Sequence, residues 1–222
     1  MHTSVRISGS GLKLRLRTAS HGKKSFFSFH YKDVIDFRAN VVRKHWVAKE
    51  REEAGYFDAS IWKEAQKTND LGQARLIKGA LDNTSATCVL VGSQTYARPW
   101  VRYEIVKSIC RGDRVFAVHI NQIKGKDQLT KSNGPNPFDY LALKYSDDGK
   151  KIEVFEAKDG KWDVYAKLSG YTLENTAAEQ RWGKFFKFLS LGYKIYCWSE
   201  DDGYNNCSTW VGGLFYVVSD RN

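Results

Sequence analysis

The chain of 222 residues is long enough for one sizeable domain, and its 42% hydrophobic and 27% charged residues are typical of a folded globular protein. Its longest apolar runs, such as 86–92 and 213–218, fall far short of the ~20 residues of a membrane helix, which excludes a membrane-spanning protein. Of the net charge of +10, +6 lies in residues 1–24, which hold no acid; the remaining +4 predicts no dedicated nucleic-acid binding.

Residues 1–24 form a basic tail that we leave outside the fold argument. Leu12, Leu14 and Leu16 alternate with basic residues in a short strand-like pattern. The tail lacks the continuous apolar core of a secretory signal. We expect it to be disordered.

Residues 25–120 alternate between short apolar runs and amphipathic segments. The apolar runs predict buried parallel strands at 25–30, 86–92 and 114–120, with a weaker strand at 55–58. Recurrence of apolar residues every three or four positions predicts helices at 33–49, 70–81 and 100–110, with a helical turn at 60–67. Asp33 is expected to cap the first helix. This alternation predicts an α/β fold with a flavodoxin-like, doubly wound parallel sheet.

The second half of the chain differs from the first in composition and residue pattern. Polar residues with glycine and proline predict a long loop at 121–137, and Asp159-Gly160 predicts a hairpin over 151–166. An amphipathic helix is expected at 177–190, followed by aromatic, strand-like residues at 193–218. We therefore expect residues 25–120 to form the core and residues 121–222 to form a mixed α/β elaboration packed on it, in one compact domain.

Several familiar catalytic motifs are absent. The sequence contains no phosphate-binding loop of the G-x-x-x-x-G-K-[ST] type, no G-x-G-x-x-G after a strand and no G-x-S-x-G elbow. Its four cysteines have no C-x-x-C spacing and its five histidines are scattered, so no metal site is expected. Without a secretory signal, we expect a reducing, cytoplasmic setting.

The doubly wound fold itself nominates a ligand site. In such sheets, ligands bind beyond the carboxyl ends of the strands, where the strand order reverses. That rule nominates four segments: 28–33, 58–62, 92–96 and the loop after His119. The alternative is that these are ordinary turns, because every α/β sheet has such loops.

Glu104 is the acid that stands out. On a helix over 100–110, Val101 and Ile105 belong to the apolar stripe and Glu104 lies beside it, at the margin of the core. The alternative is a solvated boundary glutamate paired with Lys107 or Arg111.

Several segments together resemble the TIR-like component of the Thoeris antiphage defence system. They are 26–33, 57–62, 83–93, 100–104, 134–140 and 201–205. The resemblance covers about residues 25–210 and leaves out the tail.

The resemblance implies an enzyme that cleaves the nicotinamide–ribose bond of NAD+ and cyclises the ADP-ribose part into a signal nucleotide. NAD+ would be the substrate, and no cofactor is implied. The diffusible signal would activate a separate effector, and a phage-derived trigger would start its synthesis. The family's catalytic glutamate maps onto Glu104.

The resemblance and the strand-end rule together nominate further substrate contacts. They are Ser28, Phe29, His30, Tyr31, Asp58, Trp62, Asn83 and Ser93. His30-Tyr31 departs from the pair more usual in TIR domains, which leaves the nicotinamide contacts open.

Three other functions remain as alternatives. The chain would be a non-catalytic TIR scaffold that works by self-assembly, a nucleoside transferase that ignores NAD+, or, least favoured, a basic nucleic-acid binder. Replacement of Glu104 by glutamine separates the enzyme from the scaffold. Self-association, the linkage of the cyclic product and the role of residues 121–222 stay open.

Overall fold

The computed structural model describes residues 16–17, 25–48, 70–82, 84–168, 170–173, 175–212 and 215–216. The expected strand at 55–58 and helical turn at 60–67 lie outside this range, as do most of the tail, Asp58, Trp62 and Asn83. Within the tail, β1 (Leu16–Arg17) pairs antiparallel with β11 (Phe215–Tyr216).

The main sheet has the strand order β10-β4-β3-β2, and each neighbouring pair is parallel. Its strands are β2 (Ser25–Ser28), β3 (Ala86–Val91), β4 (Arg114–His119) and β10 (Ile195–Cys197). Three of them are the strands expected at 25–30, 86–92 and 114–120. All residues of β2 and β3 are buried, which accounts for their continuous apolar sequence.

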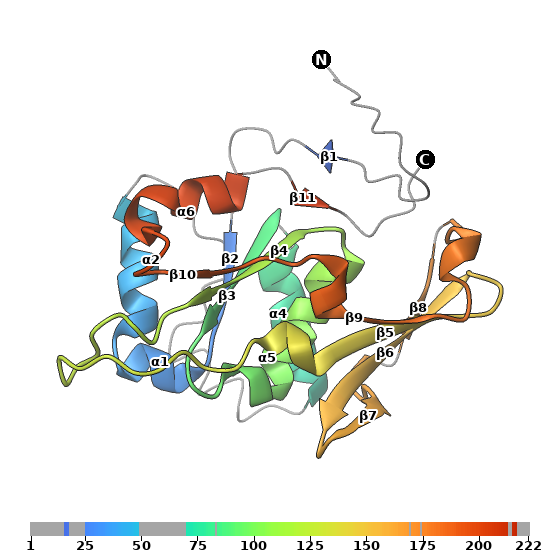
Figure 1. Ribbon diagram of the computed structural model, residues 1–222, viewed down its shortest axis with the longest axis horizontal. Helices are drawn as coiled ribbons and strands as arrows, with labels where there is room; N and C mark the ends of the chain where they lie inside the picture. The colour runs from blue at the N-terminus through green and yellow to red at the C-terminus, as the bar shows by residue number, and fades with distance from the viewer. Residues whose placement is uncertain are drawn as a thin grey trace.

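Helices cover both faces of this sheet (Figure 1). Because side chains alternate along a strand, Phe26 packs on one face and Phe27 on the other. The first face is covered by α4 (Asp70–Leu81) and α5 (Pro99–Cys110), and the second by α2 (Arg38–Ala48) and α6 (Gly203–Gly212). The expected doubly wound α/β architecture is thus confirmed, as are the helices at 70–81 and 100–110.

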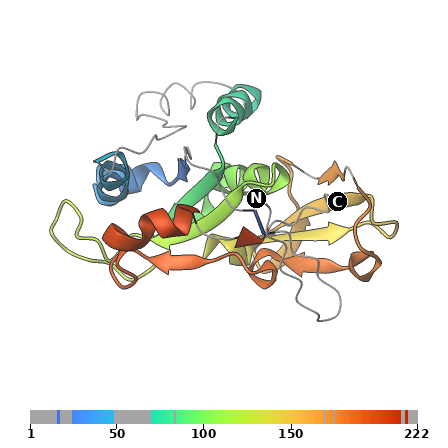
Figure 2. The same ribbon diagram turned by 90° about the horizontal axis from the view of Figure 1, so that it is seen from above.

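A second, antiparallel sheet lies on the opposite side of the molecule from α2 (Figures 1 and 2). Its order is β7-β6-β5-β9, with β8 paired to β6. The strands are β5 (Leu141–Tyr145), β6 (Lys151–Lys158), β7 (Lys161–Val164), β8 (Gly170–Thr172) and β9 (Phe185–Lys187). The expected hairpin is confirmed: Asp159 and Gly160 both have positive φ, as a tight turn between β6 and β7 requires.

The first expected helix is divided in two. α1 (Tyr31–Ile35) and α2 are separated by Asp36 and Phe37, and Phe37 has a φ of 65°. A left-handed residue ends one helix and redirects the chain into the next, a break that apolar spacing does not reveal.

The amphipathic helix predicted at 177–190 is wrong. That segment forms a 3₁₀ turn at Glu179–Arg181, strand β9 and a second 3₁₀ turn at Phe188–Leu191. Gly183 has a φ of 66°, a left-handed conformation that a continuous helix does not contain. Beyond it, Phe185 pairs with Lys144 of β5. Tertiary pairing overrides the helical spacing of the aromatic residues.

The strand-like pattern at 193–218 is correct for β10 but wrong for α6. Tyr196 of β10 and Trp210 of α6 stack with ring centroids 4.4 Å apart and planes 6° apart. The aromatic residues of this region therefore pack a helix against a strand.

The division of the chain at residue 120 remains a prediction, but the main sheet draws on both of its parts. β10 completes the sheet beside β4, and α6 covers its second face. Phe138 and Leu143 share one apolar cluster with Val89 of β3. Among the described residues, no helix is both long and apolar enough to cross a lipid bilayer.

Candidate functional site

At the carboxyl ends of β2 and β3, which are neighbours in the main sheet, the chain leaves toward opposite faces of the sheet. After β2 the chain enters α1 and α2 on one face, whereas after β3 it passes through a 3₁₀ turn at Thr95–Ala97 into α5 on the other. The loops diverge there, and such a divergence is where doubly wound sheets bind ligands.

Glu104 is buried at this point and only 3% exposed. It lies in the second turn of α5, which begins at Pro99, and its carboxyl accepts a hydrogen bond from Ser28 Oγ at the end of β2. Burial raises the pKa of Glu104 to about 8, although the Ser28 hydrogen bond acts in the opposite direction. The alternative of a solvated glutamate paired with Lys107 or Arg111 is therefore wrong.

Asp33 approaches the same strand ends from the α1 side. The expected capping role is wrong: His30 is the N-cap of α1, without a side-chain cap bond, and Asp33 lies inside the helix. Its carboxylate accepts a hydrogen bond of 3.4 Å from Thr95 Oγ1, which in turn accepts one from the Gly92 N–H. Burial raises the pKa of Asp33 to about 6, opposed by Thr95 and by nearby cations.

A cavity of about 430 Å³ opens beside Asp33. It is lined by His30, Lys32, Asp33, Ile35, Asp36, Ser93, Gln94, Lys126 and Lys131. Burial, with Arg98 and Lys32 nearby, lowers the pKa of His30 to about 4, so its ring is neutral at neutral pH. The cavity therefore combines two carboxylates, a neutral imidazole and three lysines.

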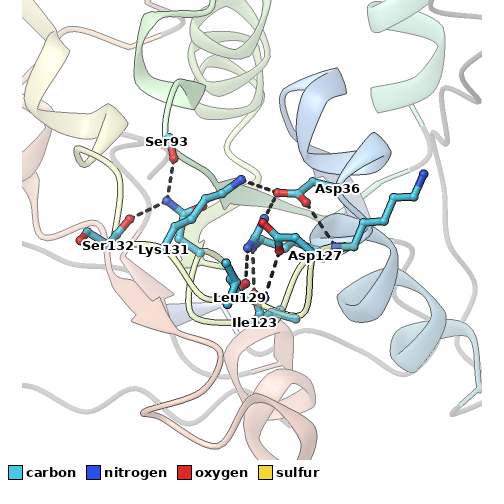
Figure 3. Close-up of polar contacts among 10 residues, drawn as sticks. Asp36, Ser93, Ile123, Asp127, Leu129, Lys131 and Ser132 are labelled. Atoms are coloured by element: carbon cyan, nitrogen blue, oxygen red, sulfur yellow. Dashed lines mark hydrogen bonds and ion pairs between the residues drawn. The ribbon is translucent and has the colours of Figure 1, made fainter.

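The predicted long loop is confirmed between β4 and the 3₁₀ turn at Pro137–Tyr140, and polar contacts hold it against α1 and α2 (Figure 3). Arg38 is fully buried; its Nε donates to Ile123 O at 2.8 Å and its Nη2 to Leu129 O at 2.6 Å. Asp36 pairs with Arg38 and, at 2.6 Å, with Lys131 Nζ.

At the start of the loop, Asn121 Nδ2 donates to Ser93 Oγ at 2.9 Å and to Ser132 O at 2.6 Å. Ser93 belongs to the loop that follows β3. This contact therefore ties the long loop to the strand ends, and the loop brings Lys126 and Lys131 to the cavity.

Gly134 is expected not to tolerate a side chain. A Cβ at this position would lie 2.0 Å from the backbone oxygen of Gly92, so Gly134→Ala must push the loop away from the end of β3. We expect a loss of about 1–3 kcal/mol in the free energy of unfolding, measured by urea denaturation. Gly79→Ala is the control: it meets no atom within 4 Å inside α4 and should stabilise by up to about 1 kcal/mol. Equal effects of the two changes would contradict this account.

The structure brings some of the predicted site residues together and not others. Ser28 contacts Glu104, while His30 and Ser93 line the cavity. Tyr31 is the half-buried first residue of α1. Phe29 is 5% exposed and lies in the core cluster on the α2 side, so it does not line this cavity.

Sequence reasoning did not single out Arg38, Lys126 or Lys131, because their partners lie on other elements and leave no local signal. Asp33 and Thr95 lie within the nominated segments 28–33 and 92–96, and Asn121 lies in the nominated loop after His119. The contacts of Thr95 with Asp33 and of Asn121 with Ser93 were not predicted. Among the described residues, no cluster of three or more His, Cys, Asp or Glu is placed to hold a metal ion.

A larger cavity, of about 820 Å³, lies between α5 and the second sheet. The buried Arg102 there is bound by Glu156 at 2.5 Å and donates to the Tyr96 backbone oxygen at 2.9 Å. Glu104 lines neither cavity, but only the smaller one is lined by Asp33, His30 and Ser93 at the ends of β2 and β3, so we place the candidate site there.

Comparison with known proteins identifies relatives of this chain. Residues 26–124 match the family described as "Thoeris protein ThsB, TIR-like domain". The chain is 54% identical over 190 residues to a protein of Bacillus cereus (strain MSX-D12) named "Putative cyclic ADP-D-ribose synthase ThsB1". That match covers 85% of this chain and 98% of the relative.

Proposed function

The chain belongs to the Thoeris ThsB family of TIR-like domains, and from this we propose that it converts NAD+ into nicotinamide and a cyclic ADP-ribose signal. The name of the Bacillus cereus relative, a cyclic ADP-D-ribose synthase, supports this reaction. The observation that carries the proposal is the buried Glu104 carboxyl, bound to Ser28 at the carboxyl end of β2.

Cleavage of the nicotinamide–ribose bond suits a single carboxylate. The electron pair of the bond goes to the ring nitrogen, so nicotinamide leaves neutral and needs no general acid. The ribose becomes oxocarbenium-like, as in glycoside cleavage, and a nearby carboxylate stabilises its positive charge. We propose that Glu104 supplies that charge.

The raised pKa of Glu104 fits this role. A buried carboxyl with a pKa of about 8 is mostly neutral at pH 7 in the free protein. The positively charged nicotinamide ring of NAD+ would lower that pKa and favour the carboxylate. Substrate binding would therefore ionise the group that the reaction needs.

The 430 Å³ cavity suits the rest of the substrate. A carboxylate such as Asp33 accepts hydrogen bonds from ribose hydroxyls, while Lys32, Lys126 and Lys131 lie where they would attract the pyrophosphate. NAD+ is consumed as a substrate in this proposal, and no cofactor is called for.

Lys126→Ala is expected to raise the KM for NAD+ about fivefold to tenfold, with little change in kcat, because one charge toward the pyrophosphate is lost. The effect should shrink at high salt. The control, Lys144→Ala, removes an exposed charge from β5 in the second sheet and should leave KM unchanged. A KM of wild-type size for Lys126→Ala would remove this lysine from the binding site.

We further propose that the product is a diffusible signal that activates a separate effector after phage infection. A separate effector makes a sharp test possible, because the synthase can be expressed alone. Cells expressing the wild type or Glu104→Gln are infected with several phages, and filtered lysates are analysed by mass spectrometry.

The proposal predicts a species with the mass of ADP-ribose less one water, present for the wild type and absent for Glu104→Gln. Equal amounts in both would remove Glu104 from the reaction. If no NAD-derived product forms with either protein, although both are expressed, the scaffold function replaces the enzyme.

A further inference from the structure

Two carboxylates, Asp33 and Asp36, line the cavity at the strand ends, and Asp36 is already paired with Arg38 and Lys131. Asp33 is buried to 9% exposure, yet it lines the 430 Å³ cavity, whereas Glu104 is not among the lining residues. The end of β3 leaves room for it: a Cβ on Gly92 would lie 2.1 Å from Asp33 Oδ1. Glycine at this position therefore lets the carboxylate lie against the strand end.

The surroundings of Asp33 keep it ready to accept a proton. Thr95 Oγ1 donates to Asp33 Oδ2, and cations from three other elements act on it: Arg38 of α2, Arg98 before α5 and Lys131 of the long loop. Along its own segment lie four further titratable side chains, those of His30, Tyr31, Lys32 and Asp36. With a pKa of about 6, Asp33 is mostly ionised at pH 7, and protonation there costs little.

The proton balance of cyclisation calls for such a group. When the C1′–N bond of NAD+ breaks, its electron pair leaves with neutral nicotinamide. If a hydroxyl of the same molecule forms the new C1′–O bond, that hydroxyl must lose its proton. A ring nitrogen would form its bond without losing one. Glu104 has a different task, because its negative charge is needed beside the oxocarbenium-like ribose.

Resting on the proposed NAD+ cyclase function, we propose that Asp33 accepts the proton of the attacking hydroxyl and so directs the ADP-ribose part toward the cyclic product. Asp33 on α1 and Glu104 on α5 reach the β2/β3 edge from opposite faces of the sheet. The two carboxyls thus divide the reaction: Glu104 promotes bond cleavage and Asp33 promotes ring closure.

The first test compares Asp33→Asn with the wild type in extracts of infected cells supplied with NAD+. Nicotinamide, linear ADP-ribose and the cyclic product are measured together. We expect the ratio of cyclic to linear product to fall about 100-fold, as for loss of a general base, while nicotinamide release falls less than about tenfold. Asp139→Asn, an exposed aspartate in the 3₁₀ turn at Pro137–Tyr140, is the control and should leave both unchanged.

A ratio of wild-type size in Asp33→Asn would overturn the proposal. Loss of nicotinamide release together with the cyclic product, in a variant that unfolds cooperatively like the wild type, would also overturn it, because Asp33 would then act before ring closure. If the wild type itself forms no NAD-derived product, the proposed function fails instead.

A second test leaves Asp33 in place and changes its partner. Thr95→Val removes the hydrogen bond that lowers the pKa of Asp33. The rate of cyclic-product formation is measured against pH, and its acid limb, the fall on the acid side expected near pH 6 in the wild type, should move up by about one pH unit. Thr95→Ser keeps the hydroxyl and should keep the limb. A purely structural Asp33 would give no shift, and an unmoved limb in Thr95→Val would overturn the proposal even if Asp33→Asn does not fold.

Discussion

Glu104→Gln is expected to become more stable than the wild type as the pH rises. Its rate of NAD+ cleavage is expected to be about 100- to 1,000-fold lower than that of the wild type. The folded protein holds a proton on Glu104 up to a pKa of about 8, whereas an unfolded glutamate releases it near its ordinary pKa of 4.5. Between these values the folded state binds more protons, so wild-type stability decreases as the pH increases. The loss is about 3–4 kcal/mol from pH 5 to pH 8.

The measurement is the free energy of unfolding in urea at several pH values. The slope against pH is the informative quantity, because the glutamine amide changes the hydrogen bonding to Ser28 at every pH. Glu153→Gln, at an exposed position in β6, is the control and should keep the wild-type slope. If Glu104→Gln also kept the wild-type slope, Glu104 would not be a buried neutral carboxyl.

Arg38→Ala is expected to cost about 3–5 kcal/mol, because it removes one partner of a buried charged network. The guanidinium is fully buried and binds Asp36 and the backbone oxygens of Ile123 and Leu129. Without it, two carbonyls lose their donor, and Asp36 loses one of its two cationic partners. The loop at 121–136 should then open, and trypsin should cut it much faster after Lys126 and Lys131.

The matched control is Arg111→Ala. Arg111 also binds two carboxylates, Asp82 and Asp113, but its side chain is 31% exposed and its loss should cost less than about 1 kcal/mol. Urea midpoints give the stability of both variants, and the rate of tryptic cleavage reports on the loop. A small effect of Arg38→Ala, similar to that of the control, would show that the loop does not depend on this arginine.

The parallel core was predictable because local sequence and tertiary environment agree there. The runs at 86–91 and 114–119 are apolar since both faces of each strand are covered, and burial alone produces that signal. Glu104 was also within reach of helical spacing, which placed it beside the stripe of Val101 and Ile105. Spacing did not reveal Ser28 as its partner, 76 residues away in sequence.

The second half of the chain was harder because tertiary contacts decide its structure. Phe185 and Phe186 have spacing that suits a helix, yet they form β9 against β5. Asp33 and Arg38 show the same limit at the site. Asp33 has a sequence position suited to a helix cap, but its environment comes from Thr95 and Gly92, about 60 residues away.

Titration of the Glu104 carboxyl by carbon-13 NMR tests the central claim most directly. Glu104→Gln identifies the resonance, and the pKa is measured in the free protein, with NAD+ and with NADH, whose nicotinamide ring carries no charge. The account predicts a pKa near 8 in the free protein and with NADH, and a clearly lower pKa with NAD+. A free-protein pKa near 4.5, or equal values with NAD+ and NADH, would contradict a buried carboxyl that the cationic substrate ionises.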